Sequence, residues 1–265
     1  MLVLLPPSEG KTAPARGEPV DLAALTDARP LTTTRRAVLR ALVRASRRRD
    51  AIDVLGVGAS LADEVARNVT LGDAPAAPAR TVYTGVLYGA AGLDDLDDVA
   101  LARAQRSVRT VSALWGAVAP EDRIPAYRLS MSTDLPGVGP LATAWRGPLA
   151  TALDAAARER LVVDCRSATY AAAWKPPSDG PGVVEVKVLR EAEGRRTVVS
   201  HWAKHTRGLL TRHLVRRADA EPTTPDELLA AAGEMVGTDL LDAELGAGRG
   251  GRHVLSLVVA GVPGA

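Results

Sequence analysis

A glycine-rich segment at residues 52–65 has the spacing of a turn that binds phosphate groups. An apolar residue precedes the run Gly56-Val57-Gly58, and Ala62 follows Gly58 by four residues. Two glycines permit positive φ angles and a close approach of another backbone. A helix that begins after them points unpaired N–H groups at an anion. The pattern is typical of a helix-hairpin-helix element, which holds the DNA backbone; the alternative is an ordinary turn between two helices.

Cationic side chains come shortly before this segment and would supply phosphate contacts beside the turn. The predicted DNA-binding residues are Arg44, Arg47, Arg48, Arg49, Gly56, Val57 and Gly58. A second match, Gly137-Val138-Gly139, has Thr143 where the pattern needs alanine. That segment is therefore interpreted as a plain loop.

Lys11 lies in an N-terminal loop that is rich in proline and glycine. The sequence Gly10-Lys11-Thr12 is similar to the end of a Walker A loop, which binds nucleoside triphosphates. Such a loop needs another glycine five residues before Gly10, and this chain has Leu5 there. Two prolines in the loop also remove N–H donors. These differences argue against nucleoside triphosphate hydrolysis, and Lys11 stays a candidate ligand for a single anion.

The densest group of cations lies at residues 201–213, where a basic helix is predicted over residues 203–217. Lys204, Arg207 and Arg212 fall near one side of that helix. Three of the four histidines of the chain lie in the same stretch, with no carboxylate close to them in the sequence. We therefore expect structural or solvated histidines and no metal site.

Small polar residues, among them Ser167 and Tyr170, follow a predicted strand at residues 161–165. Sites in α/β folds often form where strands end. Cys165 is the only cysteine, so the chain has neither an internal disulfide nor a cysteine-based zinc site. A strand position is usually buried, which makes this thiol a poor redox group.

The composition excludes several classes of protein. The net charge of the 265 residues is only +2, so an anion site must be a local patch. The apolar run Leu2–Leu5 is too short for a signal peptide or a membrane span of about 20 residues. We expect a soluble cytoplasmic protein with no membrane partner and no cofactor. Only four of the 33 cationic residues are lysine, which indicates that Lys11 and Lys204 occupy sites where a compact ammonium is needed.

Apolar periodicity and turn residues predict the elements that position these groups. Strands are predicted at residues 2–5, 81–84, 161–165 and 254–259, a hairpin at 183–189 and 197–202, and helices at 35–49, 99–114, 141–157, 203–217 and 224–232. This irregular order favours one compact α/β (α+β) domain over residues 1–265. We expect a mixed sheet, flanking helices and the hairpin element within that domain.

Several short blocks, separated along the chain, have a specific order and spacing. They are Ser8, Lys11 and Thr12; Tyr83-Thr84-Gly85; Leu114-Trp115-Gly116 with Pro120 and Asp122; Tyr127-Arg128-Leu129 with Met131; Trp145; Ser167 with Tyr170; and Ala203-Lys204, Arg207-Gly208 and Arg212. Through these blocks the chain resembles the YaaA peroxide-stress family over nearly its whole length.

The resemblance implies a single-domain α/β fold with a helix-hairpin-helix element. It also implies binding of double-stranded DNA and DNA junctions. A role in survival of hydrogen peroxide, through limitation of free intracellular iron, follows from the same resemblance. The family has no firmly assigned reaction.

The residues also fit an enzyme that acts on a small anionic or nucleotide-like substrate. Its cleft would be lined by Ser8, Lys11, Tyr83, Thr84, Tyr127, Arg128, Ser167, Tyr170, Lys204, Arg207 and Arg212. Lys11, Tyr127, Arg128, Lys204 and Arg207 are expected to converge on one concave site. Direct iron binding is the weakest hypothesis, because four histidines and one cysteine offer no dense set of ligands.

Overall fold

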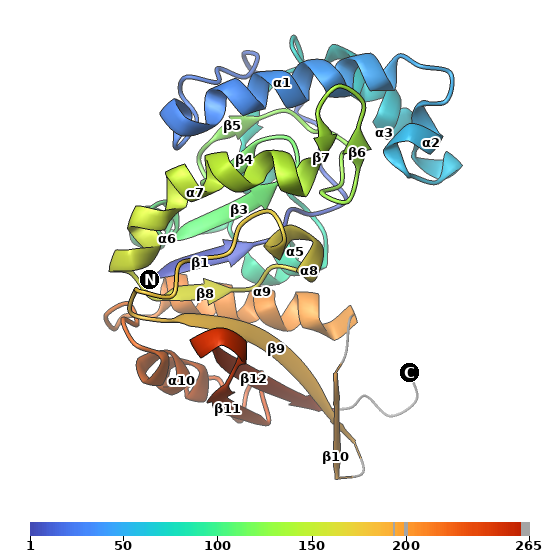
Figure 1. The fold of residues 1–265 in the computed structure, drawn as a ribbon. Coiled ribbons are helices and arrows are strands. Elements are labelled where there is room, and N and C mark those ends of the chain that lie inside the picture. Colours follow the sequence, from blue (N-terminus) through green and yellow to red (C-terminus); the bar gives the residue numbers. More distant parts are fainter. Residues whose placement is uncertain (193, 199–200, 261–265) are drawn as a thin grey trace.

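A mixed sheet of eight strands runs through the molecule (Figure 1). The computed structural model describes residues 1–192, 194–198 and 201–260. In spatial order the strands are β11 (Asp242–Ala247), β12 (His253–Ala260), β9 (Val183–Ala192), β8 (Val162–Asp164), β1 (Leu2–Leu5), β3 (Val108–Ser112) and β4 (Gly116–Val118), and β10 (Arg195–Val198) pairs with β9. The predicted single α/β domain with a mixed sheet is confirmed for these residues.

Five strands in the middle of the sheet are parallel: β3, β1, β8, β9 and β12. All four residues of β1 are buried, as is typical of a parallel strand covered on both faces. The strands β4, β10 and β11 run antiparallel to their neighbours at the margins. Because β1, β3 and β8 run in the same direction, the loops after them meet at one edge of the sheet.

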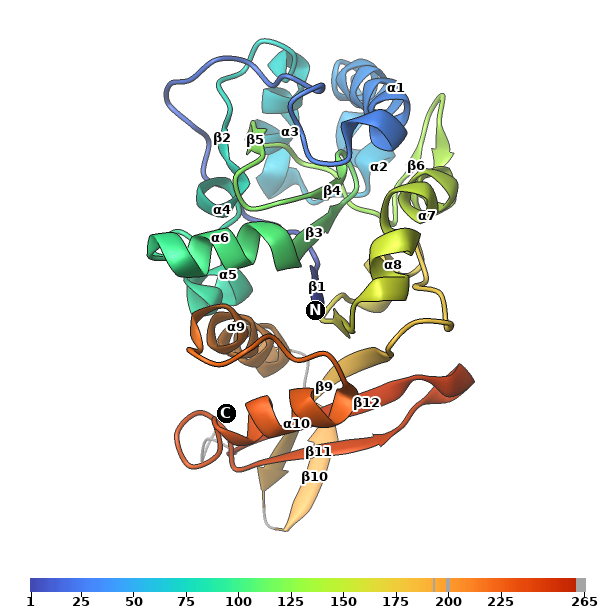
Figure 2. The same ribbon diagram turned by 90° about the vertical axis from the view of Figure 1, so that its left-hand side faces the viewer.

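Helices cover both faces of the sheet. Figure 2 shows α5 (Val86–Ala91), α6 (Asp98–Ser107) and α9 (His201–Arg216) on one side and α7 (Leu141–Glu159) and α8 (Ala168–Ala171) on the other. The structure also contains α1 (Ala28–Ser46), α2 (Ala51–Leu55), α3 (Ala62–Arg67), α4 (Ala79–Val82) and α10 (Pro225–Gly233).

Smaller elements join these layers. Short 3-10 helices cover Ala59–Leu61, Asn68–Thr70 and Arg249–Gly251. Two ribbons pair β2 (Ala77–Pro78) with β5 (Arg123–Ile124) and β6 (Asp134–Leu135) with β7 (Gly139–Pro140). No helix in the described ranges is long and apolar enough to cross a membrane.

Large indole rings fill the interior of a chain that has no phenylalanine. Trp115, Trp145 and Trp174 are fully buried. Nε1 of Trp145 donates to the carbonyl oxygen of Ala113 at 2.7 Å, which satisfies a buried N–H group. A Cβ at residue 116 would lie 2.6 Å from the Trp145 ring, and Gly116 has a φ of 73°. The packing of this ring therefore requires glycine there.

Several predicted helices are present with small changes of boundary. The segments predicted at 141–157 and 203–217 are α7 and α9. The helix predicted at 224–232 is α10, and Thr224 caps it by accepting a hydrogen bond from the N–H of Glu227. The helix predicted at 35–49 begins earlier, at Ala28, and ends at Ser46.

The helix predicted over residues 99–114 is wrong in its second half. The helix α6 ends at Ser107, and β3 begins at the next residue. Val108 and Val111 are β-branched and buried next to β1, where such side chains pack well in a strand. Tertiary pairing with β1 therefore overrides the helical pattern.

One predicted strand is absent, and another has different bounds. Residues 81–84 do not form a strand, because α4 begins directly after Pro78 and ends at Val82. The predicted hairpin is present, because β10 pairs antiparallel with β9, but its second strand, predicted at 197–202, covers Arg195–Val198, and His201 already belongs to α9. Residues 199–200 of this prediction lie outside the described residues.

Candidate functional site

A cavity of about 330 Å³ opens where the loops after the parallel strands meet. We call it the Lys11 pocket. Its walls come from the loops after β1 and β8, from residues 128–132, from the turn after α2 and from α9. Seven predicted cleft residues line it: Ser8, Lys11, Arg128, Ser167, Tyr170, Lys204 and Arg207. The fold thus brings together cations from distant parts of the chain.

The amine of Lys11 is held by backbone carbonyls and aromatic rings. Its Nζ donates to the carbonyl oxygens of Ser8 at 2.6 Å and Glu9 at 3.4 Å. The same atom lies 4.3 Å from the ring centre of Tyr127 and 5.7 Å from that of Tyr83. Burial, and to a smaller extent the positive charge of Arg128, lower the pKa of Lys11 to about 7, against the opposing charges of Glu64 and Glu9.

A chain of buried hydroxyl groups lies beneath Lys11. The hydroxyls of Tyr83 and Tyr127 are 3.0 Å apart, and that of Tyr127 is 2.6 Å from Oγ of Ser112, at the carboxyl end of β3. Oγ of Ser112 also accepts hydrogen bonds from the N–H groups of Leu114 and Trp115. Burial raises the pKa of both tyrosines, so these phenols stay neutral. Tyr83 and Tyr127 therefore support Lys11 from below and do not line the pocket.

Arg128 is fixed on one wall of the pocket by a buried amide. Asn68 accepts a hydrogen bond from the backbone N–H of Arg128 and donates to its carbonyl oxygen, each at 2.9 Å. The guanidinium lies 3.5 Å from a carboxylate oxygen of Glu64 and 4.0 Å from one of Glu9. Sequence reasoning missed Asn68 and Glu64. No local pattern marks Asn68, because its role depends on a contact 60 residues away.

The two cations of α9 have different roles. The guanidinium of Arg207 donates twice to the carbonyl oxygen of Val186, at 3.1 and 2.7 Å, and so ties α9 to β9. Lys204 is exposed at the pocket, one turn earlier on the same helix. Arg207 thus positions the helix, while Lys204 offers its charge to a ligand.

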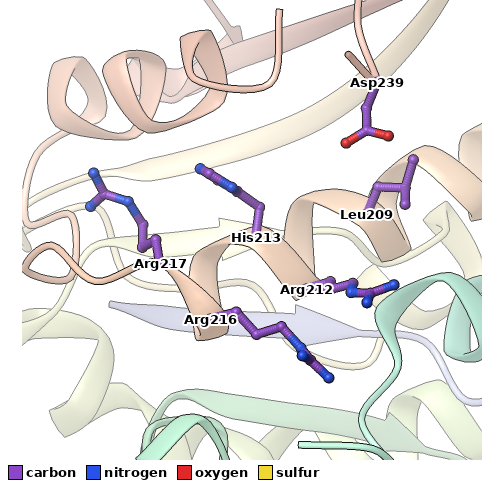
Figure 3. Close-up of a pocket in the computed structure, with 6 residues that line it drawn as sticks. All are labelled: Leu209, Arg212, His213, Arg216, Arg217 and Asp239. Atoms are coloured by element: carbon purple, nitrogen blue, oxygen red, sulfur yellow. The ribbon is translucent and has the colours of Figure 1, made fainter.

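Besides Tyr83 and Tyr127, two more predicted cleft residues lie outside the Lys11 pocket. Thr84 lines an adjoining cavity of about 140 Å³, and its N–H donates to Oγ of Ser8 at 3.0 Å. Arg212 lines a separate cavity of about 370 Å³ with His213, Arg216 and Asp239 (Figure 3). Arg212 is two helical turns beyond Lys204, roughly 12 Å along the axis, which carries its side chain past the pocket. Its assignment to the Lys11 cleft is corrected accordingly.

The glycine turn lies between two short helices, α2 and α3, and adjoins the Lys11 pocket. Gly56 and Val57 line that pocket, whereas Gly58 does not. Gly56 has a left-handed φ of 63°, and Gly58 has a φ of −73° that any residue adopts. The expected positive φ at Gly58 is therefore wrong, and the requirement for glycine falls on Gly56.

The four arginines before the turn are exposed. Arg44 lies in the last turn of α1, and Arg47, Arg48 and Arg49 lie between α1 and α2. The guanidinium of Arg48 makes two hydrogen bonds to the carboxylate of Asp50, at 2.7 and 2.8 Å. Arg48 is therefore partly neutralised.

The polar groups do not form an evident metal site. Within the described ranges, no three His, Cys, Asp or Glu side chains come together to hold a metal ion. Cys165 is buried, and burial raises the pKa of its thiol to about 12, which leaves it unreactive near neutral pH.

The fold is thus an α/β domain with a basic pocket at the edge of its parallel strands. The sequence model of a family described as peroxide stress protein YaaA matches residues 1–234. The chain therefore belongs to this family, and membership supports a role related to peroxide stress.

Curated relatives agree with this assignment. A UPF0246 protein of Streptomyces coelicolor is 48% identical over 234 residues, which cover 87% of this chain and 88% of the relative. A UPF0246 protein of Corynebacterium efficiens is 38% identical over 270 residues, which cover 98% of this chain and 100% of the relative. The similarity thus extends through the segments that form the Lys11 pocket.

Proposed function

We propose that this protein is a cytoplasmic DNA-binding protein of the peroxide-stress response, which holds the phosphate backbone without reading bases and limits free intracellular iron. The observation that carries the DNA part is that Gly56 and Val57 line the same pocket as Lys11, Arg128 and Lys204. A DNA backbone that runs along this turn would contact three cationic side chains, those of Lys11, Arg128 and Lys204. Phosphate contacts of this kind give affinity that depends on salt and little on base sequence.

A titration of duplex DNA at several salt concentrations tests this proposal. Each lost phosphate contact reduces the slope of log affinity against log salt by roughly 0.9, so a variant with Arg47, Arg48 and Arg49 changed to alanine should have a flatter slope. The matched control changes three exposed arginines elsewhere, Arg158, Arg195 and Arg249, and should keep the slope. Equal slopes in the wild type and the first variant would remove these arginines from the interface.

A second candidate function is catalysis on a small anionic or nucleotide-like substrate. It is favoured by the concave shape of the Lys11 pocket and by the lowered pKa of Lys11. Lys11, Arg128, Lys204 and Arg207 would line this site, and Tyr127 would support Lys11 from below. Thermal shift with nucleoside monophosphates and inorganic phosphate tests it. Stabilisation that is lost in Lys204→Ala and kept in the triple arginine variant would favour this candidate.

A further inference from the structure

The amine of Lys11 is free of carboxylate partners. No carboxylate lies within 4.0 Å of its Nζ in the part of the chain that the structure describes, and the two nearby acids, Glu9 and Glu64, face the guanidinium of Arg128. Nζ donates to two carbonyl oxygens. A neutral amine has two N–H bonds, so these contacts leave its lone pair unused. This geometry suits a nucleophile.

The surroundings of Lys11 also favour the neutral form of its amine. Burial and the neighbouring Arg128 lower the pKa of Lys11 to about 7. A desolvated lysine beside another cation is the usual environment of a lysine that attacks a carbonyl group. The ammonium form persists in part, because the rings of Tyr127 and Tyr83 favour a cation. Both forms are therefore available near neutral pH.

The other groups of the pocket fit a sugar flanked by phosphates. Arg128 and Lys204 stand on two walls and offer positive charge. Ser130, Ser132 and Ser167 add hydroxyl groups at the same cavity. A ligand with an electrophilic carbon between two anionic groups would place that carbon near Lys11. In DNA, an abasic deoxyribose in its ring-opened form has an aldehyde at one end of a sugar that lies between two phosphodiesters.

We propose that Lys11 forms an imine with the aldehyde of an abasic deoxyribose bound in the Lys11 pocket. This inference rests on the proposed DNA binding and names a damaged form of DNA as the preferred ligand. Nζ adds to the aldehyde carbon and forms a C–N bond. The carbonyl oxygen then takes up the two hydrogens that the amine loses and leaves as water, so the step needs no oxidant or reductant.

Trapping with borohydride tests the inference, because the reagent reduces an imine to a stable amine. Wild-type protein is mixed with a duplex that contains one abasic site, with an intact duplex, and with a duplex that contains a tetrahydrofuran analogue without an aldehyde. We expect a covalent complex with the abasic duplex alone. Lys11→Arg should reduce the trapped fraction roughly tenfold or more, because a guanidinium stays protonated.

The chain has only four lysines, so the lysine that carries the trapped adduct can be identified unambiguously. Lys175→Arg and Lys187→Arg are matched controls outside the pocket and should keep the wild-type yield. Peptide mapping of the wild-type complex needs no variant and should place the adduct on Lys11. The N-terminal amine is the other candidate, and it faces Glu221 at 3.3 Å. An adduct on that amine or on another lysine, or none with an abasic duplex that the protein binds, overturns the inference.

Two further measurements separate this inference from the proposed DNA binding. If intact duplex binds in the salt titration but abasic duplex gives no adduct, the imine is refuted and DNA binding stands. If no duplex binds, 2-deoxyribose 5-phosphate with cyanoborohydride supplies an independent test. Selective labelling of Lys11 by this small aldehyde would then support Lys11 as the imine-forming nucleophile. Absence of such labelling would refute that role.

Discussion

Two opposing effects act on the amine of Lys11. Burial and the charge of Arg128 favour the neutral amine, whereas the charges of Glu64 and Glu9 and the faces of the Tyr83 and Tyr127 rings favour the ammonium. With a pKa of about 7, the group changes charge over a narrow range near neutral pH. In the reaction inferred above, the same side chain would be a cation on the acid side and a nucleophile on the alkaline side.

We expect the rate of borohydride trapping to rise as the pH increases through about 7. The pKa in the folded protein is lowered from 10.5, so the nucleophilic amine is already populated well below the usual range of a lysine. Initial rates at constant ionic strength measure this effect. In Arg128→Gln the midpoint should move to higher pH, because a charge that disfavours the ammonium is removed. A rate that does not depend on pH would contradict the assignment.

At the scale of elements, the close contact between α5 and α9 holds Lys204 at the pocket. Gly208 is the point of closest approach. A Cβ there would lie 2.3 Å from the carbonyl oxygen of Leu87 and 2.7 Å from Cβ of Ala90. Because Leu87 lines the Lys11 pocket, a shift of α9 away from α5 would also open the pocket.

Gly208→Ala should destabilise the protein by about 1–3 kcal/mol, because the added methyl group meets backbone that cannot move freely. Gly89→Ala is the matched control. Gly89 lies in α5 with nothing within 4 Å of its Cβ position, so alanine should stabilise the helix by roughly 0.5–1 kcal/mol. Urea unfolding of both variants gives the two free energies. Equal stability of the two variants would show that the helices can separate without loss.

At the scale of the whole molecule, positive charge is concentrated locally. The net charge is only +2, yet the Lys11 pocket gathers four cations from the N-terminal loop, residue 128 and α9. Such a cluster attracts anions at short range without making the whole surface basic. In the proposed function, this cluster would hold the phosphate backbone of DNA.

Deletion of the gene should sensitise cells to hydrogen peroxide, and a permeant iron chelator should mask the defect. The expectation follows from family membership together with the proposed limitation of free iron. Survival curves of the deleted strain, its parent and a complemented strain measure it under iron-replete growth. Identical death rates of parent and deletion strain would show that this chain has lost the stress role.

Much of the local structure follows from the sequence alone, because it depends on neighbours along the chain. The apolar run Leu2–Leu5 is β1, and the cap and proline at Thr224 and Pro225 begin α10. The family blocks also contain Lys11, Arg128, Lys204 and Arg207, the four cations of the pocket. Ser167 and Tyr170, after β8, are further pocket residues in these blocks.

Only the tertiary structure decides what those residues contact. Pairing with β1 turns residues 108–112 from an expected helix into β3. The guanidinium of Arg207 is hydrogen-bonded to the carbonyl oxygen of Val186. Arg212, on the same helix, lines another cavity. The pKa of Lys11 depends on Arg128, 117 positions later in the sequence, and on burial that no local pattern records. Electrostatics and packing act through space, so the chemistry of this pocket is set by contacts that the order of residues does not contain.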